Sequence, residues 1–327
     1  MLKLKLLLIF LVNLLFLPFY IFFFLLCLFM TFIPIFPVVT ARKNVKDRLG
    51  IKGLKNRLFI ARVFLNYVFY LFEIIFFEPL RLTHASLPKN FNLKNLIVEL
   101  QEVFPEGKNI GFTYLAGHVA NLEFQTIPIV KAKKILKKGK VLGLARVPRS
   151  KIIIKILTWH RERPGLGMIW TDRNLFANMR DALAKDCSLC LVADQKPKKK
   201  GIFIRFFGEY AAFPTTGLRF CMEQKSVVVY SFSYRIIPGW VKNFYQCGKN
   251  FHLDRSQQVK SIYENSDGLI EGDLFSNGDQ DIIDTKDVLA TKEMTYFVKW
   301  LEDNIKKYPT QWSWDYRKWS RRAEENN

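Results

Sequence analysis

The sequence has few cysteine, histidine and acidic residues. Its 327 residues include five cysteines and four histidines, and 29 acidic side chains stand against 50 basic ones. Five cysteines are too few for a disulfide scaffold at this length and fit a reducing compartment. The shortage of acidic residues leaves a formal net charge of +21, which implies an anionic partner: nucleic acid, an anionic bilayer, or an acidic carrier or lipid. Hydrophobic residues make up 50% of the chain, so a disordered or fibrous protein is excluded.

Charge is absent from a long stretch near the N-terminus, from Leu6 to Val39. About 20 apolar residues cross the hydrocarbon core of a bilayer, so this stretch is long enough to span one with tilt, or to bend back at Pro18. A cleaved signal peptide has a shorter apolar run and a small-residue cleavage site. Here the run ends in two prolines and a basic cluster, which comprises Arg42, Lys43, Lys46 and Arg48. We predict an uncleaved membrane anchor at residues 1–40, with the body of the protein in the cytoplasm.

Residues 41–107 are predicted to form amphipathic, membrane-proximal helices. Within them, residues 56–83 mix aliphatic and aromatic side chains with charges that are too frequent for a lipid-facing span. A helix that lies on the bilayer surface or packs on the rest of the protein fits this pattern better.

Residues 108–327 alternate short apolar runs with amphipathic stretches, which predicts an α/β domain with a central, mostly parallel or mixed sheet flanked by helices. The strongest strand candidate in the second half is residues 225–237, and a final helix is expected at about 288–307. The acidic segment 264–287 carries turn signals, so we expect an exposed loop insertion there.

The sharpest motif is Gly117–Glu123, which follows the apolar run at 109–116. His118 therefore lies just beyond a predicted strand, where open α/β sheets place their chemistry. A turn into a helix would bring the Glu123 carboxylate to one nitrogen of the His118 ring, which fixes the tautomer and makes the other nitrogen a general base. The alternative is a histidine that caps a helix, with Glu123 on the surface.

This motif resembles the His-x4-Asp/Glu acyltransferases, and specifically the late (secondary) acyltransferases of lipid A biosynthesis. Further segments resemble that family in the same order; they are Leu144–Arg146, Leu157–Arg161, Leu191–Gln195, Ile204–Gly208, Phe213–Gly217 and Tyr308–Trp314 with Arg317 and Lys318. The resemblance covers residues 40 to 320. It departs from the family pattern at Leu122, where a tryptophan is usual, and at Asp315-Tyr316, where the tail normally has His-Arg.

The resemblance implies transfer of a fatty acyl chain from acyl carrier protein to a hydroxyl of a lipid A precursor, at the cytoplasmic face of the bacterial inner membrane. His118 would deprotonate the hydroxyl and Glu123 would stabilise the imidazolium, so no metal or organic cofactor is required. No serine or cysteine nucleophile motif is evident, which fits direct attack on the thioester. The oxyanion is expected to be bound by backbone N–H groups beside His118 or by a nearby arginine.

By the same resemblance, Arg161 and Asp194 complete the catalytic site. A shift of two residues in how this segment aligns with the family would put Arg163 in the place of Arg161. Substrate-binding residues are expected at Asn121, Arg146, Arg163, Gln195 and Arg205.

Two lysine clusters, at 131–140 and 196–200, are candidates for contact with anionic partners. The first cluster would attract an acidic carrier protein, and both would hold lipid headgroups or sugar phosphates, unless they only form a solubilising face. Nucleic acid is the rival partner, but these clusters lack interleaved aromatic residues for base stacking, so we expect none. Two other functions stay open: an acyltransferase for a different lipid, such as a lysophospholipid or aminolipid, and a non-catalytic membrane scaffold.

Overall fold

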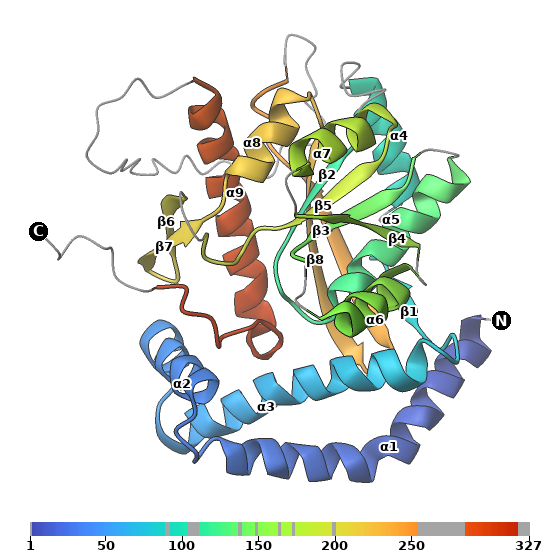
Figure 1. Ribbon diagram of the computed structural model, residues 1–327. Coiled ribbons are helices and arrows are strands. Elements are labelled where there is room, and N and C mark those ends of the chain that lie inside the picture. The colour runs from blue at the N-terminus through green and yellow to red at the C-terminus, as the bar shows by residue number, and fades with distance from the viewer. Residues whose placement is uncertain are drawn as a thin grey trace, which may run out of the picture.

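A computed structural model shows a seven-stranded mixed sheet at the centre of the protein (Figure 1). It describes residues 2–88, 92–103, 111–136, 139–147, 150–162, 165–171, 174–197, 201–253 and 285–319. The strands of this sheet are β1 (His84–Ser86), β2 (Thr113–Ala116), β3 (Val141–Ala145), β4 (Leu166–Trp170), β5 (Ser188–Val192), β8 (Val228–Ile237) and β9 (Trp240–Cys247). A separate antiparallel hairpin comprises β6 (Ile202–Phe206) and β7 (Glu209–Phe213). The predicted α/β class is confirmed.

The strand order is β1-β9-β8-β2-β5-β3-β4. Strands β8, β2, β5, β3 and β4 are parallel, and β9 is antiparallel to its neighbour β8. Because β2 lies between β8 and β5, the segment that follows β2 is placed at the middle of the carboxyl edge of the sheet.

Helices cover both faces of the sheet; after the N-terminal region they are α4 (Leu93–Val103), α5 (Leu122–Ile135), α6 (Lys151–Glu162), α7 (Leu175–Ala184), α8 (Thr216–Glu223) and α9 (Thr285–Lys307). Alternating strand residues divide the core in two, as the two-residue period of a strand requires. On β2, Leu115 joins the cluster formed with α7, α8 and α9, whereas Tyr114 joins the cluster formed with α4 and α5. Strand β8 and helix α9 confirm the strand expected at 225–237 and the helix expected at 288–307.

The N-terminal region forms α1 (Leu2–Met30), α2 (Phe36–Leu49), α3 (Gly53–Phe72) and a π-helical turn, η1 (Glu73–Phe77). Helix α3 crosses the carboxyl edge of the sheet, and α1 lies beyond it (Figure 1). By length and composition, Leu2–Met30 and Gly53–Phe77 are both long and apolar enough to cross a membrane.

The acidic segment predicted as a loop insertion lies outside the described residues, apart from its last three positions, which begin α9. The division of the chain at about residues 40 and 107 stays a prediction.

Candidate active site

His118 and Asp194 meet because of the register between two parallel strands. Ala116 at the end of β2 pairs with Val192 at the end of β5. His118 and Asp194 each lie two residues beyond that pair, so the segments that follow β2 and β5 leave the sheet side by side. Sheets of this kind place ligands and chemistry at the carboxyl ends of their strands.

Asp194 binds both the backbone and the ring of His118. The backbone N–H of His118 donates to Oδ2 of Asp194 at 2.7 Å, and Nδ1 of the ring lies 2.5 Å from Oδ1. Trp312 donates its indole N–H to Oδ2 at 2.8 Å. The Asp194 side chain is fully buried, with 0% exposed, whereas 27% of the His118 side chain is exposed.

These contacts oppose the effect of burial on both groups. Burial favours the neutral forms, but the charge and hydrogen bonds of the pair outweigh it, so the pKa of His118 is raised and the pKa of Asp194 is lowered. An ionised Asp194 only accepts hydrogen bonds, so Nδ1 of His118 must be the donor. The lone pair of the neutral ring is then on Nε2.

The Nε2 atom of His118 faces the exposed side of the site. The side-chain amide nitrogen of Gln195 lies 3.1 Å from it and also donates to the hydroxyl of Tyr316 at 2.7 Å. The Tyr316 ring packs edge-on against the imidazole, with 5.6 Å between the ring centroids. An amide nitrogen can only donate, so Nε2 acts here as an acceptor, which is the role of a general base.

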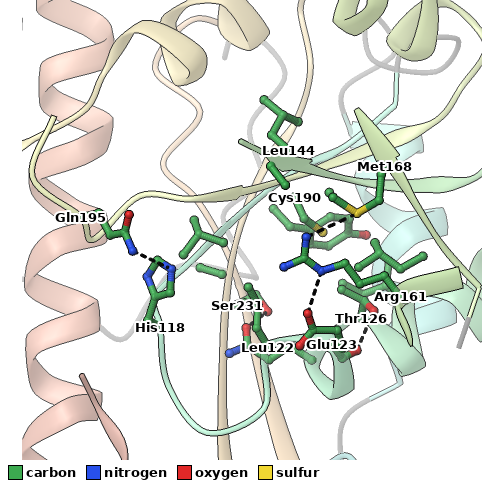
Figure 2. A pocket seen from close by; sticks show the side chains of 18 of the residues that line it. His118, Leu122, Glu123, Thr126, Leu144, Arg161, Met168, Cys190, Gln195 and Ser231 are labelled. Carbon is green, nitrogen blue, oxygen red and sulfur yellow. Dashed lines mark hydrogen bonds and ion pairs between the residues drawn. The ribbon is translucent and has the colours of Figure 1, made fainter. Parts of the chain in front are cut away.

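Glu123 is positioned differently from the sequence prediction. Its Oε1 accepts a hydrogen bond from Nε of Arg161 at 2.9 Å, and its Oε2 accepts one from the Tyr70 hydroxyl at 3.2 Å. Figure 2 shows the Glu123 side chain directed toward Arg161, while His118 lies on the other side of Leu122. The carboxylate hydrogen-bonded to the imidazole is therefore Asp194, where the sequence predicted Glu123.

The reason for this difference is the start of helix α5. Asn121 caps the helix, with its side-chain oxygen accepting from the backbone N–H of Phe124 at 3.2 Å. Glu123 is thereby fixed in the first helical turn, with 2% exposed, where the helix dipole favours a negative charge. His118 belongs to the preceding loop and points toward β5.

Asn121, predicted to bind substrate, also belongs to a buried polar network. Its amide donates to Oε2 of Glu73 at 2.9 Å. The guanidinium of Arg235, on β8, donates to both carboxylate oxygens of Glu73, at 2.7 and 2.9 Å. Asn121 and Glu73 are each 0% exposed. The π-helical turn at the end of α3 is thus bonded to the motif loop and to the sheet.

Backbone N–H groups of the motif are already used. The N–H of His118 donates to Asp194. The N–H of Val119 donates to the Gly117 carbonyl, and that of Ala120 donates to the Gln311 carbonyl. The oxyanion donors expected from this backbone are thus engaged elsewhere, and side chains at the cavity are the remaining candidates.

A cavity of about 300 Å³ extends from His118 into the protein. Gln195 lies beside His118, and Arg146, Glu123 and Arg161 also line the cavity. The walls combine apolar side chains with the polar side chains of Gln125, Thr126 and Ser231; the apolar lining residues include Ile129, Leu144, Leu166, Met168, Cys190 and Val192. Figure 2 shows Arg161 beside Met168, whose sulfur lies 3.8 Å from Nη1 of the guanidinium. Such a cavity matches an extended aliphatic chain whose polar end lies at His118.

The other predicted site residues lie in different places. Arg205 is exposed on β6, over the ring of Tyr210, and does not line this cavity. Arg163 lies outside the described residues. Of the first lysine cluster, Lys133 is 2% exposed and donates to the backbone carbonyl of Asp186 at 2.6 Å, so it is unsuited to docking a partner. Among the described residues, no group of three or more His, Cys, Asp or Glu side chains is placed to hold a metal ion.

Residues of the C-terminal tail enclose the His118–Asp194 pair, and no individual role was predicted for them. Trp312 binds Asp194, and Tyr316 holds Gln195. Lys318 is buried nearby, where loss of solvent lowers its pKa to about 7 and its charge interacts with Asp194. The one signal for them was the resemblance of the aromatic and basic tail to a family block.

Comparison with known protein families gives a match over most of the chain. The model of the bacterial lipid A biosynthesis acyltransferases matches residues 3–245 of the chain. An α/β fold with a histidine–carboxylate pair at the mouth of an apolar cavity suits a transferase of long acyl chains. The chain belongs to the bacterial lipid A biosynthesis acyltransferase family. No curated protein sequence matches it.

Proposed function

We propose that this protein transfers a fatty acyl chain from acyl carrier protein to a hydroxyl of a lipid A precursor, with His118 as the general base. The observation that carries the proposal is the arrangement of the imidazole. Its Nδ1 is bound to buried Asp194, its Nε2 is free of that carboxylate and lies beside Gln195, and the residue lines a cavity with apolar walls on one part and polar groups on another. The enzyme would act at the cytoplasmic face of the inner membrane.

In the proposed reaction, the acyl chain occupies the cavity and its thioester lies near His118. The Nε2 atom takes the proton of the acceptor hydroxyl, and the hydroxyl oxygen attacks the thioester carbonyl. The carbon–sulfur bond then breaks, and the leaving thiolate takes the proton from the imidazolium. The products are an ester and the free thiol of the carrier, with no covalent enzyme intermediate. Asp194 stabilises the imidazolium formed during attack.

Two side chains are the proposed oxyanion donors. The amide of Gln195 is already 3.1 Å from Nε2, so it would lie beside the acceptor hydroxyl. Arg161 reaches the cavity while Glu123 holds its Nε atom. A positioned cation and an amide directed at the developing charge would stabilise the oxyanion. Glu123 then acts through Arg161 as a positioning residue.

Lipid profiling of a deletion strain tests the proposal. We expect one acyl chain to be missing from lipid A, and to be restored by the wild-type gene but not by His118→Ala. His84→Ala is the matched control, because His84 lies on edge strand β1 and does not line the cavity. A complete lipid A in the deletion strain would exclude this acceptor, and a change confined to phospholipids would identify another lipid as the substrate. Full restoration of lipid A acylation by His118→Ala would show that His118 is not the general base.

A further inference from the structure

We infer that α1 and α3 lie together in the plane of one membrane leaflet and that neither crosses the bilayer. The inference concerns how the protein meets the lipid and does not depend on the substrate. Both helices are long enough to span. Their contacts with the rest of the protein determine the orientation.

Helix α3 touches the α/β domain along its whole length. Near its start, Phe59 packs on Trp314 with ring centroids 6.2 Å apart. Near its end, the Tyr70 hydroxyl bonds Glu123 at 3.2 Å. Between them, the amide of Asn66 donates to the Thr310 carbonyl at 3.1 Å. A spanning helix would carry one end about 30 Å away from a domain that stays on one side of the membrane. Its two ends could not both contact that domain.

Helix α1 is held in the same way. Near its N-terminus, the Ile9 side chain is fully buried, with 0% exposed. Further along, the amide of Asn13 donates to the carbonyl of Pro238, in the turn between β8 and β9, at 2.9 Å. Both the start and the middle of α1 therefore lie against the α/β domain.

The rest of α1 packs antiparallel along α3. Phe16 packs against Phe72 with ring centroids 5.1 Å apart, and Tyr20 against Phe69 at 5.0 Å. At the end of the helix, Arg57 on α3 donates to the carbonyl of Thr31. Figure 1 shows the second half of α1 beside α3, beneath the carboxyl edge of the sheet, and the N-terminal half bent toward the side of the α/β domain. We call the two helices the α1–α3 hairpin.

The opposite side of this hairpin is a continuous apolar surface. On α1 the exposed apolar side chains cover most of the circumference of the helix; they include Leu4, Leu7, Phe10, Leu11, Leu14, Leu15, Leu17, Phe19, Ile21, Phe22, Leu25 and Phe29. Leu54, Leu71, Ile75 and Leu80 extend the surface along α3 and past η1. An apolar surface of this size in water is unusual for a soluble protein and marks a site of interaction.

The charges around the hairpin identify a lipid leaflet as the occupant. Lys3 lies in the first turn of α1, while Lys43 and Lys46 follow that helix on α2, and all three are exposed. Basic residues favour the cytoplasmic side, so basic residues at both ends of α1 agree with both ends on that side. Arg62 is exposed near the middle of α3, where a spanning helix would bury it in hydrocarbon. In an in-plane helix it reaches the headgroups.

Cysteine accessibility distinguishes the two orientations. In a Cys187→Ser background, we would place single reporters at Lys3→Cys, Lys43→Cys and Asp303→Cys. A membrane-impermeant maleimide is then added to intact spheroplasts or to inverted vesicles. We expect all three to be labelled in inverted vesicles and none in spheroplasts. Labelling of Lys3→Cys from the spheroplast exterior would overturn the inference.

Depth measurements provide a second, independent readout. Fluorophores at Leu4→Cys, Leu15→Cys and Phe29→Cys would be quenched by lipids brominated at different acyl positions. We expect all three depths to fall within one leaflet. A Leu15 probe at the bilayer centre, with the other two near the interfaces, would contradict it, as would failure of the protein to float with vesicles. Acyl transfer measured on the same variants separates a wrong orientation from a wrong reaction.

Discussion

Asp194 binds His118 through two separate contacts, one to the backbone N–H at 2.7 Å and one to the ring nitrogen Nδ1 at 2.5 Å. The carboxylate therefore fixes both the loop that carries the histidine and the tautomer of its ring. The remaining ring nitrogen is left for a proton from substrate. Each step of the proposed chemistry depends on this relationship.

Asp194→Asn should lower kcat by about 10²- to 10⁴-fold, because the imidazolium loses its negative partner and the tautomer is no longer enforced. The pH profile should move as well. His118 acts in its neutral form, so kcat/KM rises with pH through its pKa, which Asp194 raises. In the variant that rise should occur at lower pH. Initial rates between pH 5 and 9 measure both effects, and an unmoved profile would mean that Asp194 does not set the basicity of His118.

Glu123→Gln tests the second carboxylate. Its loss leaves the Arg161 guanidinium without its partner at 2.9 Å, so we expect a fall in kcat of about 10- to 100-fold. The rise of kcat/KM with pH through the pKa of His118, which we call the acidic limb, should shift less than in Asp194→Asn. The reason is that Glu123 affects His118 only through its charge. Arg161→Lys is the companion variant, since lysine keeps the charge but not the fork geometry. If Glu123→Gln shifts the limb more than Asp194→Asn does, Glu123 is the true partner.

The network around Glu73 should determine stability. Arg235→Ala leaves the Glu73 carboxylate buried without its bidentate partner, and breaking such a pair costs about 3–5 kcal/mol. Arg219→Ala is the control: it removes an i,i+4 pair with Glu223 on α8 that is partly exposed, which contributes about 0.3–0.5 kcal/mol. Denaturant titration in detergent compares the free energies of unfolding. Equal losses in the two variants would show that the buried network does not hold α3 to the sheet.

Gly143→Leu should change the choice of acyl chain. Gly143 lies in the cavity wall, and a Cβ there meets Leu166 at 3.6 Å and Met168 at 3.7 Å, which is ordinary contact distance. A larger side chain would fill the cavity. One methylene in a closed pocket changes kcat/KM by about 10-fold or more. The ratio of kcat/KM for long acyl donors to that for short ones should therefore fall by at least about 10-fold. Competition between donors of different length measures it, with Gly143→Ala as the graded control. An unchanged ratio would place the acyl chain elsewhere.

The general architecture was predictable from sequence because buried strands and amphipathic helices leave local patterns. The apolar run before the motif placed His118 just past a strand, and residues 225–237 gave the long strand β8. Those features depend on neighbours in the chain.

The partner of His118 was harder to predict because it depends on register. Asp194 lies 76 positions away, and only the pairing of Ala116 with Val192 brings it to the imidazole. Spacing favoured Glu123, but the cap at Asn121 fixes Glu123 inside α5. The resemblance to the family named Asp194 as a site residue without saying what it binds. The roles of Glu73 and Trp312 likewise depend on packing between distant segments.

The most direct test of the central claim is acyl transfer by purified protein in vesicles that contain a lipid A precursor, with acyl carrier protein as the donor. Mass spectrometry should show the precursor gaining one acyl chain, at a rate about 10²- to 10⁴-fold lower for His118→Ala than for wild type or His84→Ala. An equal rate for His118→Ala, or no acylated precursor from the wild-type protein, would contradict the account.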